Sequence, residues 1–403
     1  MKTVAQLTGQ LSWRLEPAPA TLTNERPDLV QALTAGRAAR ELPALLSALF
    51  SMCAHAHRLT ASRAIDAAQG VDTPLTPAQQ RHLQIETLRE HLRRLWLDWP
   101  RLIRVDDTVR PRGLLELAHC PVLRGEALAG DDNADAALVE LREWLERYVF
   151  AQPMSRWLGD WHAGGDAALS DWVRSRSTLA SRLLLAAQPL AQSLRLPAQG
   201  WHVGEGSDGP LRHLADQLEH QPATSRQPTW QGAAVETGPW TRLHAPWCKD
   251  SAPSLWWRLG ARLADIAHLA APDDEATHGG RHWLATGTLQ LGEHAGLAWT
   301  EMARGVLLHW VRLGSADAQA RVSACRVVSP TEWNFHAHGV VAQALAAPGQ
   351  EDMSLRLRMI PMLVAAYDPC VPLVVTGAAD RVLLTWPPAG GAARSDEEAS
   401  CMS

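Results

Sequence analysis

The chain has 403 residues, of which 46% are hydrophobic, so it is long and apolar enough to bury a large core. No apolar run has the length of a membrane span and no secretory signal pattern opens the sequence, so we expect a cytoplasmic protein. The net charge of -5 and the pI near 6.4 provide no basic surface for a polyanion, so we expect no nucleic-acid partner.

The cysteine and tryptophan contents indicate the redox state of the thiols and the make-up of the core. Six cysteines lie far apart without the paired spacing of a secreted disulfide framework, so we expect reduced thiols at Cys53, Cys120, Cys248, Cys325, Cys370 and Cys401. The chain has 18 Trp but 2 Tyr and 3 Phe, and we expect these indoles mainly in the core. The alternative is that some of these indoles form a docking surface.

The first hundred residues predict two short strands followed by helices. Residues 5 to 16 alternate moderately, as strands do. Leucines at spacings of three and four then predict two helical segments that end near Phe50. A helix is expected over 53 to 69, and another after Thr76-Pro77, where a capping residue precedes proline at the first helical position.

The rest of the chain predicts more helices and one hairpin. Helical patterns recur at 134 to 149, 178 to 195, 253 to 269 and 353 to 367. Residues 200 to 250 are rich in Gly, Pro, Thr and Gln and predict a loop or insertion. Runs of β-branched residues at 303 to 313 and 319 to 328 predict a hairpin. We therefore expect an α+β, mainly helical fold, with residues 1 to 388 as one domain and 389 to 403 as a disordered tail.

Three short elements carry residues with metal or acid-base chemistry. Cys53 and His57 lie four positions apart, so they share a helix face as a metal-ligand or nucleophile-base pair, or as a buried thiol beside a hydrogen-bonded histidine. Cys370 follows Asp368-Pro369, where proline ends a helix and puts the thiol on a turn, to bind metal or merely to pack. Trp333-Asn334, after the hairpin, is by itself an ordinary buried indole and turn.

Taken in order, four motifs resemble the large subunit of nickel-iron hydrogenases. The first metal loop of that family matches Gly36-Arg37, Arg40-Glu41, Phe50-Ser51-Met52-Cys53, His57, Leu59 and Arg63-Ala64. The hairpin motif matches Glu301, Arg304-Gly305, Leu307 and His309-Trp310, and the next motif matches Pro330-Thr331 and Trp333-Asn334. The C-terminal Asp-Pro-Cys motif matches Asp368-Pro369-Cys370.

The departures from that family concern the metal ligands. In the enzymes four thiolates hold nickel and iron, whereas here the first is replaced by Phe50 and the last by Leu373. Bulky hydrocarbon side chains supply no soft donor, so we expect no nickel and no hydrogenase activity. Cys53 and Cys370 remain as the implied metal ligands.

Other positions depart in the same direction. The family's arginine over the open metal position lies in a motif replaced by Ala337-His338-Gly339, and the histidine that precedes its cleaved tail is Thr376. The proton-relay glutamate falls loosely on Gln31. By resemblance we expect His57, His55, His338 and Asp368 around the two ligands, and Phe50 and Leu373 at the vacated ligand positions.

A retained fold with discarded nickel ligands resembles the hydrogenase accessory proteins of the HupK and HoxV type. The resemblance implies a scaffold that transiently holds an iron centre with cyanide and carbon monoxide ligands. Its partners would be hydrogenase maturation proteins and the large-subunit precursor. The alternative is a cofactor-free mimic of the large subunit that acts as a chaperone. The scaffold hypothesis predicts that Cys53 and Cys370 face one another across a small, mostly apolar cavity lined also by Phe50 and Leu373.

Overall fold

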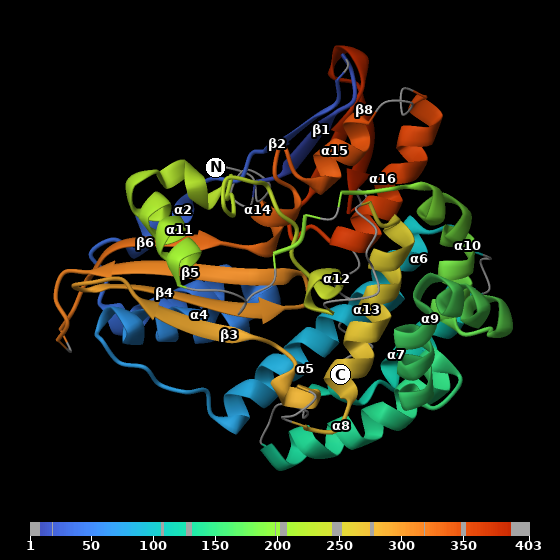
Figure 1. The fold of residues 1–403 in the computed structure, drawn as a ribbon, viewed down its shortest axis with the longest axis horizontal. Helices are drawn as coiled ribbons and strands as arrows, with labels where there is room; N and C mark the ends of the chain where they lie inside the picture. The colour runs from blue at the N-terminus through green and yellow to red at the C-terminus, as the bar shows by residue number, and fades with distance from the viewer. Residues whose placement is uncertain are drawn as a thin grey trace.

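A computed structural model describes residues 9–17, 19–105, 109–125, 131–197, 199–201, 208–243, 252–274, 278–317, 319–347 and 352–387. Two four-stranded sheets and a larger set of helices build the fold, which confirms the expected α+β, mainly helical class (Figure 1). The division into one domain and a tail stays a prediction, and residues 389 to 403 lie outside the described part. Within that part, no helix has the length and apolarity to cross a membrane.

The antiparallel sheet is a meander in the order β3-β4-β5-β6. Its strands are β3 (Thr286–Gln290), β4 (Ala295–Met302), β5 (Gly305–Leu313) and β6 (Val322–Val328). The last two confirm the predicted hairpin, with Val311 opposite Cys325. Neighbouring residues of β4 point to opposite faces, so Leu297 packs in one apolar cluster and Ala298 in another.

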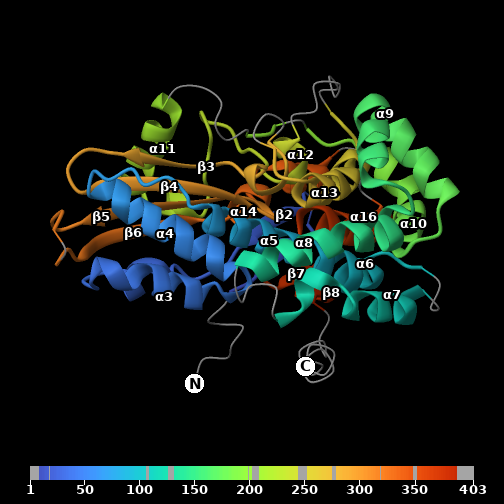
Figure 2. The same ribbon diagram turned by 90° about the horizontal axis from the view of Figure 1, so that it is seen from below.

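Helix α4 (Ala54–Ala68) covers one face of this sheet (Figure 2). The segment that matches the first motif of the resembled family lies at the start of this helix. Glycine at position 296 of β4 permits close packing, because a Cβ there would lie 2.3 Å from the carbonyl oxygen of Ala64. Helices α2 (Leu29–Thr34) and α3 (Leu42–Leu49) precede α4, as the leucine spacing predicts. The loop between α3 and α4 is thereby anchored to the sheet.

The other half of the molecule is helical. Helix α5 (Pro77–Arg93) begins with the predicted cap, since the Thr76 side chain accepts from the Gln79 backbone. The helices that follow are α6 (Trp99–Leu102), α7 (Val109–Ala118), α8 (Asp131–Leu145), α9 (Met154–Ser175), α10 (Leu179–Ser193), α11 (Gly209–His220), α12 (Pro239–Arg242), α13 (Leu255–Ala270), α14 (Pro330–Asn334), α15 (Val340–Ala346) and α16 (Met353–Tyr367). Helix α9 has no counterpart among the predicted elements. The predicted loop or insertion at 200 to 250 contains a helix, because α11 buries Leu214 and Leu218 at helical spacing.

The second sheet joins the two ends of the chain in the order β2-β1-β7-β8. It contains β1 (Leu11–Arg14), β2 (Thr21–Asn24), β7 (Leu373–Thr376) and β8 (Val382–Trp386). Strand β1 pairs in parallel with β7, so Leu11 lies opposite Leu373. Of the predicted strand region 5 to 16, residues 5 to 8 lie outside the described part. The sheet brings the N-terminal segment beside the turn that carries Cys370.

Candidate metal centre

The first thiol lies in the tight connection between α3 and α4. Helix α3 ends at Leu49, and the carbonyl oxygen of the next residue, Phe50, accepts a hydrogen bond of 3.1 Å from the backbone N–H of Cys53. The Glu86 carboxylate then caps α4, accepting from the backbone N–H groups of His55 at 2.8 Å and Ala56 at 3.0 Å. Burial raises the pKa of the Cys53 thiol above its usual value, and it raises the pKa of Glu86 to about 7.

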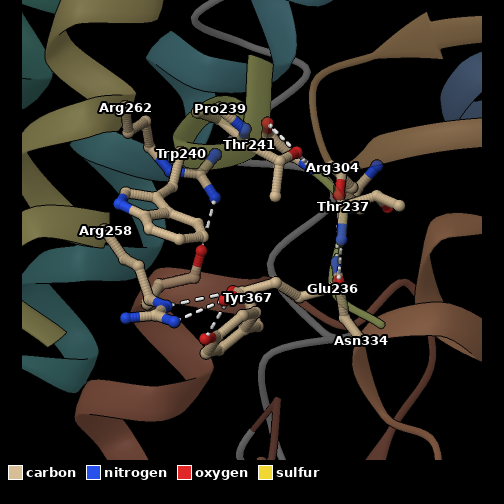
Figure 3. A pocket seen from close by; sticks show the side chains of 12 residues that line it. Glu236, Thr237, Pro239, Trp240, Thr241, Arg258, Arg262, Arg304, Asn334 and Tyr367 are labelled. Atoms are coloured by element: carbon tan, nitrogen blue, oxygen red, sulfur yellow. Dashed lines mark hydrogen bonds and ion pairs between the residues drawn. The ribbon is translucent and has the colours of Figure 1, made fainter. Parts of the chain in front are cut away.

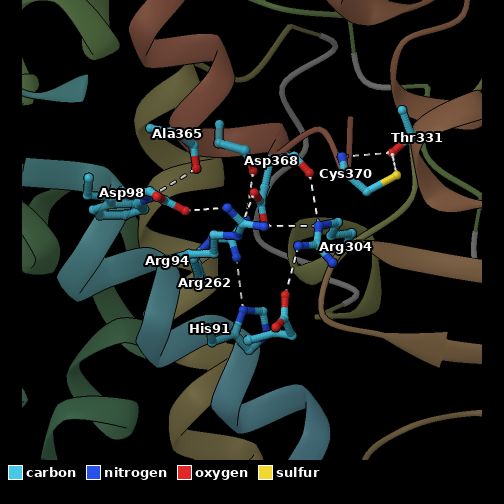
Figure 4. Close-up of polar contacts among 12 residues, drawn as sticks. His91, Arg94, Asp98, Arg262, Arg304, Thr331, Ala365, Asp368 and Cys370 are labelled. Atoms are coloured by element: carbon cyan, nitrogen blue, oxygen red, sulfur yellow. Dashed lines mark hydrogen bonds and ion pairs between the residues drawn. The ribbon is translucent and has the colours of Figure 1, made fainter. Parts of the chain in front are cut away.

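The second thiol lies on the turn after α16. Asp368 ends the helix in the left-handed region with φ of 49°, and Pro369 prevents its continuation. The backbone N–H of Cys370 donates to Thr331 Oγ1 at 3.3 Å, and the Thr331 hydroxyl lies 3.0 Å from Cys370 Sγ, to which it donates (Figure 4). Helix α14 thus holds this turn in place through one hydroxyl group.

Cys53 and Cys370, which are far apart in the sequence, line one cavity of about 630 Å³. Both thiols therefore line the same cavity, and their close approach as shared metal ligands stays a prediction. The expectation that the cavity is small is wrong, because it extends along the residues that lead into α2. Its walls are mostly apolar and consist largely of Pro27, Leu29, Val30, Leu33, Leu49, Phe50, Met52, Met302, Val327, Pro330 and Val371. Leu33 and Met52 are also exposed, so they lie where the cavity meets solvent.

Three arginines (Arg26, Arg226 and Arg304) and two carboxylates (Asp28 and Glu332) line this mostly apolar cavity, and Arg26 and Arg304 are the arginines that interact with the cysteines. Arg26, which follows β2, donates from Nη1 to Glu332 Oε1 at 2.6 Å and lies 3.4 Å from Ser329 Oγ. Arg304 is 3% exposed, and its Nη1 has no hydrogen-bond partner among the described residues. Arg304 belongs to one of the four sequence motifs, whereas Arg26 was not predicted, because a lone arginine before a proline carries no spacing signal. Both guanidinium groups interact electrostatically with both cysteines.

Of the four residues expected around the ligands, His57 is the one that lines the cavity. Its Nδ1 lies 3.1 Å from Nε2 of His309 on β5, and burial lowers the pKa of His57 well below its usual value. The ring of His57 stacks on Phe50, with centroids 4.1 Å apart. The expectation for His55 is wrong, since its Nε2 lies 3.2 Å from the Gln79 carbonyl oxygen, away from the cavity lining.

His338 is also absent from the cavity lining. It lies on the turn after α14, where its backbone N–H donates to His336 Nδ1 at 3.0 Å. Leu373 is fully buried in β7, so the expectation that it lines the cavity is wrong. Pairing with β1 turns this residue into the core. Gln31 accepts hydrogen bonds from the backbone of Cys325 and from Arg326, and it lies outside the lining as well.

Asp368 stands behind the cavity at the centre of a buried ion network (Figure 4). Its carboxylate lies 3.0 Å from Nε of Arg94 and 3.1 Å from Nε of Arg304. Arg304 also donates to Glu90 at 2.8 Å. Burial would raise the pKa of Asp368, but the neighbouring guanidinium charges outweigh it and hold the pKa below its usual value. The network fixes the turn before Cys370.

A second, much smaller pocket of about 20 Å³ lies beside α12 and α13 (Figure 3). Arg258 pairs there with Glu236, which also accepts a hydrogen bond of 2.8 Å from the Tyr367 hydroxyl. The guanidinium carbon of Arg258 lies 4.6 Å from the ring centroid of Trp240. This volume holds about one water molecule. The pocket is thus too small for a ligand, and the Arg258–Glu236 ion pair in it has a structural role.

The metal-binding potential of the described residues rests on the two thiols. No group of three or more His, Cys, Asp and Glu side chains suited to a metal ion occurs among the described residues. Cys120 and Cys325 are buried away from the cavity, while Cys248 and Cys401 lie outside the described part. A metal in the cavity would therefore need further ligands that it brings with it.

Comparison with known proteins gives relatives along nearly the whole chain. The chain is 38% identical to the hydrogenase expression/formation protein HoxV of Cupriavidus necator, covering 93% of this chain and 97% of the relative. It is 31% identical to the hydrogenase expression/formation protein HupK of Bradyrhizobium diazoefficiens, covering 86% and 89%. No family model matches the sequence.

Solved structures with the same fold are hydrogenases. A [NiFeSe] hydrogenase variant from Desulfovibrio vulgaris Hildenborough superposes with a TM-score of 0.51 at 14% identity, covering 87% of this chain and 92% of that chain. The [NiFeSe] hydrogenase of Dm. baculatum gives the same TM-score and identity. The fold is that of the hydrogenase large subunit, which confirms the resemblance seen in the sequence motifs.

Proposed function

Because this chain belongs to the family of HoxV and HupK hydrogenase expression/formation proteins, we propose that it is a maturation scaffold for a nickel-iron hydrogenase. Its cargo is an iron centre with cyanide and carbon monoxide ligands, held transiently by Cys53 and Cys370. Its partners are other maturation proteins and the large-subunit precursor that receives the cargo. The observation that carries this proposal is the presence of both thiols in one cavity.

The ligand number suits a carrier and not an enzyme. Low-spin iron with strong-field diatomic ligands still takes thiolate donors, and two thiolates can hold it while leaving the group exchangeable. Four would hold it permanently. Since burial raises the pKa of Cys53, cargo binding releases a proton from this thiol and becomes stronger as pH rises.

The two arginines support an anionic cargo with hydrogen-bond acceptors. A cyanide nitrogen accepts hydrogen bonds, and bonds from a guanidinium group are strengthened by its charge. Nη1 of Arg304 is buried without a described partner, which is costly unless a ligand accepts from it. Arg26 bonds to described side chains through Nη1 alone, which leaves Nε and Nη2 as donors. Both residues line the cavity.

One observation favours the alternative of a cofactor-free large-subunit mimic. The raised pKa of Cys53 describes a protonated thiol, which is a poor nucleophile and a poor ligand until a metal displaces its proton. In that alternative both cysteines pack as small apolar side chains, and the protein acts through its surface.

Infrared spectroscopy of anaerobically purified protein separates the two functions. The scaffold function predicts metal-bound cyanide and carbon monoxide bands in wild type and their loss in Cys53→Ser and Cys370→Ser. The serine hydroxyl is a hard donor that stays protonated near neutral pH, so each substitution removes one iron ligand at little cost to the fold. Cys325→Ser is the matched control, because this thiol is also buried but lies outside the cavity. It should keep the bands.

Maturation in the native host gives the second readout. Either ligand variant should impair hydrogenase maturation nearly as much as the double variant, because the two thiols act as a unit. Thermal melting confirms that each variant is folded before maturation is scored. Full maturation by both single variants, in a host where deletion of the whole protein abolishes it, would reject the scaffold function and favour the mimic.

A further inference from the structure

The hydrogenase fold implies nickel, but the side chains in this cavity do not fit a nickel site. We infer that Phe50, held rigid by a buried histidine pair, is the residue that excludes nickel, and that Leu373 has no part in this exclusion. The inference rests on the proposed function only in treating the cavity of Cys53 and Cys370 as a metal site. In the sequence motifs, positions 50 and 373 are both replaced ligand positions, whereas the structure gives them different roles.

Phe50 belongs to the same turn as the first thiol. Its carbonyl oxygen accepts the backbone N–H of Cys53, and both side chains line the cavity. A metal on Cys53 would therefore meet the Phe50 ring as its neighbour. The ring offers carbon where the enzyme family has a thiolate, so it supplies no donor and displaces any water that could serve as one.

The Phe50 ring is held in this position by the histidine pair. It stacks on His57 with an interplanar angle of 13°. His57 is in turn fixed by the contact between its Nδ1 and Nε2 of His309, and the two histidines are 1% and 0% exposed. Phe50 itself is partly buried and faces the cavity on its other side, so the ring is held through its contact with the closely packed His57. Nickel binding would have to break the stack without gaining a ligand.

The remaining donors in the cavity are not arranged for nickel. Of the described lining residues, Cys53 and Cys370 carry thiols, Met52 and Met302 carry thioethers, and His57, Asp28 and Glu332 carry imidazole or carboxylate groups. Among the described residues, no three His, Cys, Asp or Glu side chains form a group that could hold a metal ion. Thioethers are neutral soft donors of the kind that select Cu(I). An iron centre that brings its own diatomic ligands needs only the two thiols, whereas a bare nickel ion lacks ligands in this cavity.

Leu373 differs from Phe50 because the strand pairing has moved it out of the cavity. It is fully buried, opposite Leu11 on β1 and Trp386 on β8, and it is not a lining residue. A thiol at position 373 would lie in the apolar core of this sheet. Restoring cysteine should therefore have an effect at position 50 and none at position 373.

The test compares nickel binding by the full chain of wild type, Phe50→Cys and the matched control Leu373→Cys. Each metal-free protein is titrated anaerobically with Ni²⁺, and bound nickel is measured after gel filtration together with thiolate-to-nickel charge-transfer absorption. Phe50→Cys should bind about one equivalent with a Kd at least about tenfold lower than wild type, because it adds a third thiol. Leu373→Cys should bind as wild type does.

Two results would overturn the inference. One is wild-type protein that binds nickel as tightly as Phe50→Cys, and the other is Leu373→Cys that gains as much nickel as Phe50→Cys. If melting shows that Phe50→Cys is unfolded, Phe50→His keeps a flat ring against His57 while adding an imidazole donor, and failure of this variant to gain nickel would equally reject the inference. Absence of iron bands would reject the proposed function and leave this nickel readout intact.

Discussion

Replacing Asp368 by asparagine isolates the charge that holds the Cys370 turn. The side chain keeps its size, and asparagine tolerates the left-handed conformation that Asp368 adopts with φ of 49°. The substitution weakens two buried ion pairs, to Arg94 at 3.0 Å and to Arg304 at 3.1 Å. Its effect therefore reports the electrostatic contribution of one carboxylate.

The expected loss of stability follows from the partners that remain. Breaking a buried ion pair costs about 3 to 5 kcal/mol when the other charge is left unpaired. Here Arg304 keeps Glu90 and the backbone carbonyl of residue 368, and Arg94 keeps Asp98, so we expect about 3 kcal/mol. At about 2.1 cal/mol/K of unfolding entropy per residue, a chain of 403 residues should lose roughly 3 to 4 °C in Tm.

The difference between the two proteins should depend on pH. Because the guanidinium charges hold the pKa of Asp368 below its usual value, its contribution to stability is present above the unfolded pKa of about 3.9 and is lost as pH falls through the lower folded pKa. The Tm difference between wild type and Asp368→Asn should therefore be constant near neutral pH and shrink below about pH 4. Other acidic groups titrate in both proteins and cancel in this comparison.

Differential scanning calorimetry or fluorescence melting at neutral and acid pH measures these differences, and infrared spectra of the same samples report the cargo. If the variant melted within about 1 °C of wild type at pH 7, or if the difference did not shrink in acid, the assignment of Asp368 as a charged anchor would be wrong. If Asp368→Asn loses stability as expected but keeps the cyanide and carbon monoxide bands, the Cys370 turn is positioned without this charge.

Three further predictions concern activity, processing and the remaining thiols. Purified protein should neither take up nor evolve hydrogen when nickel is supplied, and nickel-dependent turnover in a gas-exchange assay would contradict the proposed function. The chain in its native host should keep its C-terminus, because Thr376 stands where the processed family has histidine, and an intact mass that shows cleavage after 376 would refute this. Cys120→Ser and Cys325→Ser should each lose about 1 kcal/mol of stability in melting experiments, because both thiols are fully buried, but they should support full maturation.

The sequence alone determined the features that depend on local order and spacing. The helices around Phe50 follow from leucines on one face, and the start of α5 follows from Thr76-Pro77. The four motifs identified the fold because their internal spacing is a property of the sequence. They also identified Cys53 and Cys370 as the thiols that share a cavity.

Tertiary structure alone decided which other side chains reach that cavity. Arg26 enters because β2 and β1 place the N-terminal segment beside the Cys370 turn, a long-range pairing that leaves no local signal. His55 and His338, close to the motifs in sequence, point elsewhere because a helix or a turn rotates them away. Leu373 lies three positions after Cys370, yet its pairing with Leu11 buries it outside the cavity. Sequence spacing defines distance along the chain, whereas strand register and helix packing decide which way a side chain faces.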